Sequence, residues 1–253
     1  MRNKRHSRSR AYAAACLVAA AFLFVGGLAM PVRADDSRPV IRLSSANLPP
    51  VMTPAQDGYL DRILAELFDR VGHTVVMIDV PPRRGLIDAA NGLHDGDAGR
   101  LNVVTQTIPD LIAVTPPVLS VDMLGLYISD TVDIRSYEDF RKYSVGYLRG
   151  WRIAEAKFDD HPDAIAVSTP DVLMRMLTEG RIEVAFLTRA PARYIAETHG
   201  ITDLKESAFY DRYPLHIHLN KRHADLLPDL SAALTDMKAD GTIDAILSVE
   251  PAR

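Results

Sequence analysis

The feature that most constrains the fold is a repeated alternation of short apolar segments with amphipathic helical segments, which follows the first 39 residues. Residues 40–45 (VIRLSS) have the composition of a strand, and residues 57–72 (DGYLDRILAELFDRVG) carry apolar side chains at helical spacing. The same order returns in residues 73–81 (HTVVMIDVP) and 82–92 (PRRGLIDAANG). Strands that alternate with helices predict an α/β fold with largely parallel sheets.

The alternation restarts in the second half of the chain, and no linker rich in proline, glycine or serine separates the halves. The crossings between them must therefore be strands or tight loops. We expect crossing strands near residues 124–129 and 215–220. The first lobe is then discontinuous and comprises residues 35–123 and a return segment, 218–253. Residues 124–217 form the second lobe.

The N-terminal 34 residues have the order of a secretory signal, with basic residues first, an apolar run next, and the small residues Val32 and Ala34 last. We expect cleavage after Ala34 and a periplasmic location. An uncleaved membrane anchor is the alternative, because the apolar run approaches the ~20 residues that span a bilayer. The single cysteine, Cys16, lies early in that run, which argues against a lipid-bearing cysteine at the cleavage site.

Composition excludes several classes of partner once the signal is removed. The remaining chain has 23 Lys and Arg against 33 Asp and Glu, a net charge of −10. Such a surface disfavours nucleic acid and anionic membranes as partners. The mature chain has no cysteine, so it folds without disulfides, and no apolar run in it is long enough to span a bilayer. We expect a monomer without membrane insertion after cleavage.

Two similar turns connect helices to strands. NGLHDG (residues 91–96) and TEGRIE (residues 178–183) each end a helix at glycine and lead directly into an apolar segment. In the longer stretch NGLHDGDAGR (residues 91–100), the glycines at positions 92, 96 and 99 are predicted to allow tight turns that present Arg100. The helix before the second turn begins with Thr169 as N-cap and Pro170 in the first turn. Because α/β proteins bind ligands at the carboxyl ends of their strands, we expect a site where these turns deliver side chains.

Five segments together resemble the bacterial family 3 extracellular solute-binding proteins, the periplasmic receptors of amino acid uptake systems. The resemblance covers roughly residues 40–250 and implies an α/β, two-lobed periplasmic binding protein type II fold, in which each lobe is a mostly parallel sheet flanked by helices. It also implies capture of a small solute between the lobes and delivery to an inner-membrane ABC permease, with no cofactor and no catalysis. The segments are DGYLDRILAELFDRVG, PPRRGLIDAANGLHDGDAGR, VGYLRGW, MLTEGRIEVAFLT and LHIHLNKRHADLLPDLSAALTDMKADGTIDAIL.

Two departures from the family pattern concern the ligand. The family's amino acid receptors carry Thr-x-x-Arg after the first-lobe turn, whose arginine holds the ligand carboxylate, whereas this chain reads DGDAGRLN and Arg100 comes sooner. Where they often carry an aspartate for the ligand ammonium, this chain has AFLTR, with Thr188 at that position. The departures argue against an α-amino acid ligand. They resemble a divergent branch of the family that reads Asp-Gly-Glu-x-x-Arg.

Arg100 is the first candidate ligand-binding residue, because a guanidinium can grip a carboxylate through two parallel hydrogen bonds. The alternative is that Arg100 pairs with Asp95 or Asp97 to hold the turn. Asn47 follows the first strand in ANLPPVM, a segment expected to line the mouth of the cleft, and Tyr59 begins the next helix. For Tyr59, a buried structural role is the alternative.

Three further candidates lie at helix starts. Arg84, beside Arg83, opens a helix where the dipole disfavours basic residues, which hints at an anionic partner. Trp151 follows Gly150 at a strand-to-helix turn in the second lobe and is either an apolar wall of the site or part of the core. Thr188 ends a predicted strand.

Metal and enzyme interpretations are weaker. Asp95, Asp97 and Gly99 imitate the start of a calcium loop, but no further acids follow to complete it. His216 and His218 share a strand face near His223, yet a zinc site would need another ligand. An enzyme on the same scaffold, resembling prephenate-type dehydratases, would need an acid or base in the cleft, for which the candidates are Asp95, Asp97 and Glu183. A sensor that captures a solute without transport is the third possibility.

Overall fold

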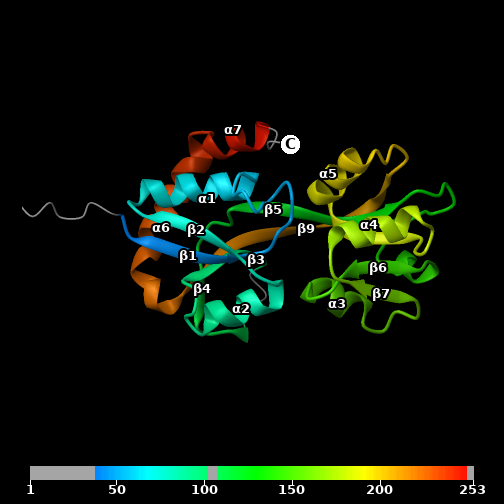
Figure 1. Cartoon of the computed structure of the whole chain (residues 1–253), viewed down its shortest axis with the longest axis horizontal. Coiled ribbons are helices and arrows are strands. Elements are labelled where there is room, and N and C mark those ends of the chain that lie inside the picture. Colours follow the sequence, from blue (N-terminus) through cyan, green and yellow to red (C-terminus); the bar gives the residue numbers. More distant parts are fainter. Residues whose placement is uncertain (1–37, 102–106, 250–253) are drawn as a thin grey trace, which may run out of the picture. The chain divides into compact units, whose positions relative to one another are not determined.

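The computed structural model describes residues 38–101 and 107–249. The predicted signal segment and its cleavage site lie outside the described residues. Figure 1 shows helices packed around one mixed sheet. The strands are β1 (Val40–Ser45), β2 (Thr74–Asp79), β3 (Gly96–Leu101), β4 (Leu111–Ala113), β5 (Leu119–Tyr127), β6 (Val145–Leu148), β7 (Ala164–Val167), β8 (Val184–Thr188) and β9 (Lys205–Asn220). The helices are α1 (Tyr59–Arg70), α2 (Pro82–Ala90), α3 (Arg152–Phe158), α4 (Pro170–Thr178), α5 (Arg189–His199), α6 (Leu227–Ala239) and α7 (Thr242–Ser248), with short 3-10 helices η2 (Glu138–Lys142) and η3 (Lys221–Leu226).

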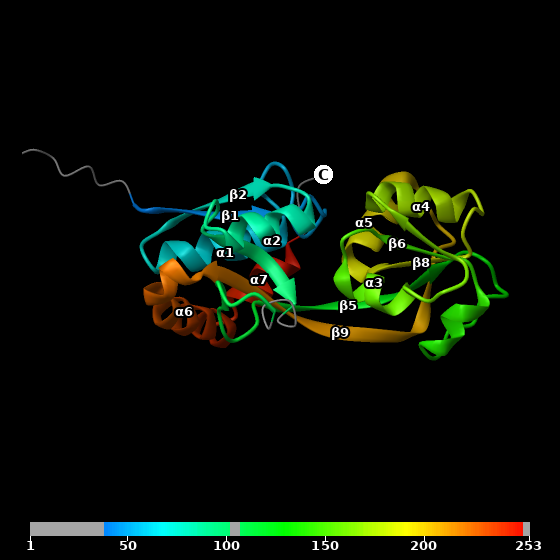
Figure 2. The same ribbon diagram turned by 90° about the horizontal axis from the view of Figure 1, so that it is seen from below.

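The sheet has the strand order β2-β1-β3-β9-β5-β8-β6-β7, and β4 also pairs with β9. Each lobe has a parallel group, β2-β1-β3 in the first and β8-β6-β7 in the second. Between these groups, β5 and β9 form a long antiparallel pair that runs from one lobe to the other, as both views show (Figures 1 and 2). Predicted α/β alternation and mostly parallel lobes are confirmed.

The apolar residues pack into separate cores. The first-lobe core joins Leu43 and Leu64 to Ile217 and Leu234, so the C-terminal segment packs with the N-terminal one. The second lobe packs through two adjoining cores drawn from residues 123–213. The exact lobe boundaries given by the sequence stay a prediction.

Local sequence signals account for several helix starts. The Thr169 hydroxyl accepts a hydrogen bond from the Val172 amide at 3.3 Å, and Pro170 occupies the first turn of α4, so the predicted N-cap is confirmed. Before α1, the Asp61 carboxylate accepts hydrogen bonds from the amides of Gly58 and Thr53, at 3.1 and 2.9 Å. These bonds fix the segment that connects β1 to α1.

The NGLHDGDAGR stretch ends α2 and enters β3 as predicted, and Gly92 has a φ of +74°. Gly96 and Gly99 are not turn residues, however, so that part of the prediction is wrong. Both lie in β3, where a Cβ on Gly96 would sit 2.2 Å from the His218 carbonyl oxygen and one on Gly99 would sit 3.0 Å from Leu215 Cδ2. Close approach of β9 is therefore the reason for these two glycines.

The strand β9 is much longer than the crossing strand expected near residues 215–220. It spans Lys205–Asn220 because residues 205–215 pair with β5. Residues 205–212 (KESAFYDR) lack the polar–apolar alternation that indicates a strand, and their pairing partner β5 is far away in the sequence.

Candidate functional site

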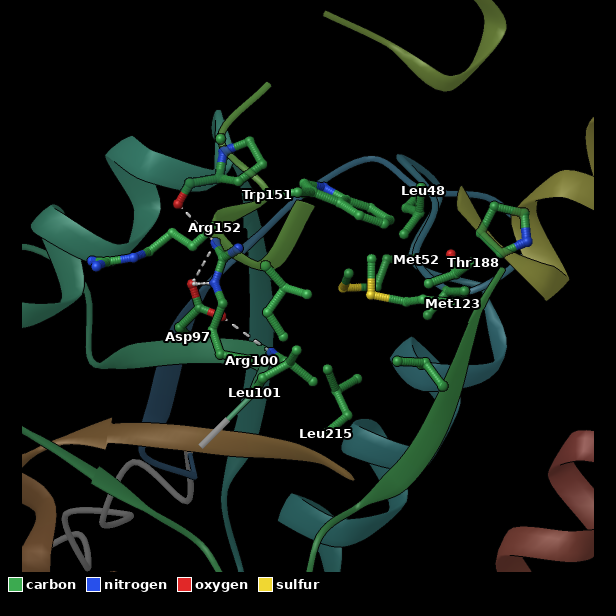
Figure 3. Close-up of a pocket in the computed structure, with 18 of the residues that line it drawn as sticks. Leu48, Met52, Asp97, Arg100, Leu101, Met123, Trp151, Arg152, Thr188 and Leu215 are labelled. Carbon is green, nitrogen blue, oxygen red and sulfur yellow. Dashed lines mark hydrogen bonds and ion pairs between the residues drawn. The ribbon is translucent and has the colours of Figure 1, made fainter. Parts of the chain in front are cut away.

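A cavity of about 1170 Å³ is lined by residues of both lobes and of the crossing strands β5 and β9. Figure 3 shows its side chains converging from β3, β5, β8 and the loops before α1 and α3. The first lobe contributes the loop between β1 and α1, the start of α2 and the end of β3, and the second lobe contributes the starts of α3 and α5. Its apolar lining is Leu48, Val51, Met52, Leu86, Ile87, Leu101, Ile108, Val121, Met123, Trp151, Ile153, Pro191 and Leu215.

Arg100 lines this cavity from β3 and is held in place by two partners. Its Nε donates to Asp97 Oδ2 at 3.0 Å, and a terminal nitrogen donates to the Pro82 carbonyl at 2.8 Å (Figure 3). The Asp97 side chain is 2% exposed, and burial raises the pKa of its carboxyl while Arg100 opposes that rise. Arg100 thus pairs with Asp97 inside β3 and also lines the cavity, with 19% of its side chain exposed, and ligand contact through it stays a prediction.

A histidine pair lies beside Arg100. In register, His218 is opposite Asp97 and His216 is opposite Arg100. His216 Nδ1 is 2.9 Å from the Val114 carbonyl, whereas neither ring nitrogen of His218 has a hydrogen-bond partner among the described residues. Burial, followed by the charges of His216 and Arg100, lowers the pKa of His218 to about 4, so its imidazole is neutral at physiological pH.

Metal-ligand geometry is not found in residues 38–101 and 107–249, where no group of three or more histidine, cysteine or acidic side chains could hold an ion. His223 turns away to Asp95, at 2.7 Å, and Asp95 also pairs with Arg222. Asp95 therefore connects η3 to the first lobe, and it is not among the residues that line the cavity.

The second lobe contributes Trp151 and Thr188. Trp151 is the N-cap residue of α3 and packs against both second-lobe cores, while its side chain also borders the cavity (Figure 3). Thr188 ends β8 and is the N-cap residue of α5. It is 7% exposed, and its hydroxyl has no hydrogen-bond partner in the described part of the chain.

An ion-pair network on the crossing strands was not foreseen from the sequence. Asp122 on β5 accepts from Arg212 Nε at 2.7 Å and also pairs with Arg189, the first residue of α5. The Arg212 guanidinium, and then Arg189, hold the pKa of the Asp122 carboxyl below its usual range. Arg189 directly follows Thr188 at the carboxyl end of a strand, which is a signal that could have found it. The register that sets Asp122 opposite Arg212 has no local signal.

Four of the six predicted ligand-binding residues line the cavity together: Tyr59, Arg100, Trp151 and Thr188. Burial raises the pKa of Tyr59 to about 12. Asn47 instead lies at a smaller pocket, where its backbone N–H donates to the Asp79 carboxylate.

Arg84 is also not among the cavity-lining residues. Its side chain is 65% exposed and pairs with Asp88 one helical turn later, at 2.8 Å. The spacing of four residues on α2 brings the two together. The neighbouring Arg83 lines the cavity in its place.

No family model matches the sequence, and no curated protein matches it significantly. Solved structures do match. A histidine kinase sensor domain with similarity to periplasmic binding proteins aligns over 86% of this chain and 100% of its own, with 20% identity and a TM-score of 0.71. ArgBP from T. maritima aligns over 82% and 93%, with 18% identity and a TM-score of 0.68.

The chain has the two-lobed fold of the periplasmic binding proteins. A third neighbour, an ancestral amino acid-binding protein described as a precursor of cyclohexadienyl dehydratase, aligns over 82% of this chain and 93% of its own, with 17% identity and a TM-score of 0.66. In the part of the chain that the structure describes, no helix is both long and apolar enough to cross a membrane.

Proposed function

We propose that this chain is a periplasmic solute-binding protein that captures a small carboxylate-bearing solute between its two lobes. The observation that carries the proposal is the position of Arg100, which faces the cavity between the lobes and is oriented by Asp97 and the Pro82 carbonyl. A guanidinium that is already held in place loses little freedom when it binds a carboxylate through a fork of two hydrogen bonds.

The charges around the cavity support an anionic ligand. Six arginines line it against four acids, and the most buried acids are already bound, Asp97 by Arg100 and Asp122 by Arg189 and Arg212. The arginines are Arg83, Arg100, Arg152, Arg189, Arg193 and Arg212, and the acids are Asp97, Asp122, Glu155 and Asp159.

The rest of the lining supports a ligand with an apolar body. Met52, Met123 and Leu215 line the cavity and lie below the indole of Trp151 in the view of Figure 3. Burying apolar ligand surface against them contributes roughly 25 cal/mol for each Å² removed from water. Orientation would come from the polar groups at the cavity wall and affinity from this apolar surface.

The proposal is tested by replacing Arg100 with lysine, which retains a cation near Asp97 but lacks the planar fork. A carboxylate ligand should bind Arg100→Lys about 30-fold more weakly, equivalent to about 2 kcal/mol, and Arg100→Ala still more weakly. Titration calorimetry with the small molecules released from the wild-type protein measures this. The exposed Arg84→Lys variant is the matched control and should bind normally. Normal binding by Arg100→Lys and Arg100→Ala would contradict the proposal.

Delivery to an inner-membrane ABC permease is our proposal for the role of the bound solute, and sensing without transport is the alternative. The likeness to ArgBP and to the amino acid-binding neighbour supports solute delivery, and the likeness to the histidine kinase sensor domain supports sensing. Uptake of labelled solute by cells with and without the gene distinguishes them. Transport predicts lost uptake, whereas sensing predicts normal uptake and a lost transcriptional response.

We propose binding without catalysis. Of the three acids considered for an enzyme, only Asp97 lines the cavity, and its carboxylate accepts from Arg100 and from the Gly99 amide at 3.2 Å. The Glu183 carboxylate accepts hydrogen bonds from the backbone amide and the hydroxyl of Ser144. Incubation of the protein with its released ligand should leave the ligand unchanged, and product formation that Asp97→Asn abolishes would establish the enzyme instead.

A further inference from the structure

Thr188 has an unusual environment among the buried polar side chains of the second lobe. Ser207, which is also buried, has its hydroxyl fully hydrogen-bonded: it accepts from the Gly125 amide at 2.9 Å and donates to the Phe209 carbonyl at 2.5 Å. Thr188 is 7% exposed and lines the cavity, and its hydroxyl has no hydrogen-bond partner within the described residues. Burying a hydroxyl without a partner is unfavourable, which indicates that a ligand supplies the missing bond.

The start of α5 adds donors at the same place. Thr188 is the N-cap residue of this 11-residue helix, and no described side chain caps its first turn. The following residues, Arg189, Ala190 and Pro191, line the cavity, and of these Arg189 and Ala190 carry a backbone N–H, whereas proline has none. The first amides of a helix lack partners inside the helix, and its dipole favours negative charge there. The hydroxyl and the helix start therefore present hydrogen-bond donors to one part of the cavity.

A ligand ammonium finds no counter-charge at this position. The nearby carboxylates of Asp122 and Glu206 are each bound by two arginines, Asp122 by Arg189 and Arg212, and Glu206 by Arg189 and Arg193. An ammonium would face the positive end of a helix and bound acids. The Thr188 hydroxyl can donate or accept, but the helix start offers donors and positive charge, so an oxygen acceptor, above all a carboxylate, suits both groups.

We propose that the start of α5 and the Thr188 hydroxyl form a second ligand subsite, specific for an oxygen acceptor at the far end of the solute. This inference rests on the proposed capture of one carboxylate by Arg100. Together the two subsites select a dicarboxylate with an apolar spacer, held by Arg100 in the first lobe and by α5 in the second, and they disfavour a ligand whose far end is an ammonium.

The test uses three matched series of probes on the full mature chain, measured by titration calorimetry. The series are the straight-chain dicarboxylates from succinate to suberate, the monocarboxylates of equal chain length, and the ω-amino acids of equal chain length. The length that best spans the two subsites should bind at least about tenfold more tightly as a dicarboxylate than as either matched probe, because hydrogen bonds to a charged group are lost in the others.

Variants then assign the difference to Thr188. Thr188→Val keeps the shape of the side chain without its hydroxyl and should weaken the best dicarboxylate about tenfold while leaving its monocarboxylate unchanged. Thr188→Ser should restore the difference. Thr169→Val is the control, because Thr169 caps α4 and does not line the cavity. It should change thermal stability without changing the preference among probes.

The outcomes separate the two proposals. If monocarboxylates bind through Arg100 and dicarboxylates gain nothing, or if Thr188→Val binds the dicarboxylate normally, the second subsite is refuted and the proposed function stands. Tighter binding of the ω-amino acid also refutes the subsite. If none of the three series binds, capture of an aliphatic carboxylate fails, and the second subsite fails with it.

Discussion

The two lobes differ in what they bury. Among the described residues, the buried polar side chains of the first lobe include Asp97 on β3 and His218 and Asn220 on β9, and Asn220 donates to the Ala89 carbonyl of α2. The second lobe instead buries an aromatic cluster in which Phe186 lies 5.2 Å from Phe158 and 5.6 Å from Phe140, measured between ring centroids.

The difference shows two ways of presenting a ligand-binding group. In the first lobe, the Arg100 guanidinium is oriented by the buried Asp97 carboxylate, whose pKa is raised by burial. The protonation of such buried groups affects the stability of this lobe. In the second, an apolar core fixes β8 and α5, and Thr188 is left at the strand end without a partner among the described residues. The first lobe orients its group by charge, and the second orients its group by packing.

The largest effect should come from the aromatic cluster. Phe186→Ala removes a fully buried ring and should lower the free energy of unfolding by about 4 kcal/mol, from lost burial and the cavity left behind. The loss should be similar at neutral and mildly acidic pH. Denaturant unfolding measures it, with Phe186→Leu as the milder control. A loss below about 1 kcal/mol, or one that changes strongly with pH, would break the comparison.

A somewhat smaller, pH-dependent effect is expected in the first lobe from His218. Its pKa is near 6.5 in the unfolded chain and about 4 in the folded protein, so the unfolded state binds more protons between these values. The contribution is fully present above pH 6.5 and is lost as the pH falls toward 4, by about 3 kcal/mol in total.

His218→Met, of similar volume, should flatten this part of the stability profile while leaving stability at neutral pH equal or higher. The measurement is the free energy of unfolding of both proteins across the acidic range. An unchanged slope would show that other groups cause the acid sensitivity.

The smallest effect should come from Arg84, the arginine that shares the first lobe with Arg100 but pairs on its surface. Arg84→Ala removes a pair in which the Arg84 side chain is 65% exposed but that of Asp88 only 10%, and should cost about 1 kcal/mol because the Asp88 carboxylate loses its charged partner. Ligand affinity should stay the same, and added salt should reduce the difference further. Thermal melts at low and high salt check this. A loss of stability above about 3 kcal/mol would mean that Arg84 on the surface matters to this lobe as much as a buried group does.

The sequence predicted what depends on local pattern. Helical spacing located α1, the Thr169 N-cap was visible in the order Thr-Pro, and the carboxyl ends of strands pointed to Arg100 and Thr188. Arg84 does not line the cavity, and it pairs instead with Asp88 one helical turn later on α2.

What could not be predicted depends on register between distant strands. The first half of β9 (KESAFYDR) shows no alternation of polar and apolar residues, and it becomes a strand only because β5 pairs with it. The same pairing sets Asp122 opposite Arg212, and the approach of β9 explains Gly96. None of these contacts has a signal within a window of a few residues.

Mass spectrometry of the small molecules released from protein purified out of the periplasm tests the central claim most directly, with wild type and Arg100→Lys compared side by side. The account predicts that a carboxylic acid is released from the wild type in near-stoichiometric amount and is depleted from the variant, while both proteins fold. An equal amount of the same ligand on both proteins, or a bound ligand without a carboxylate, would contradict it.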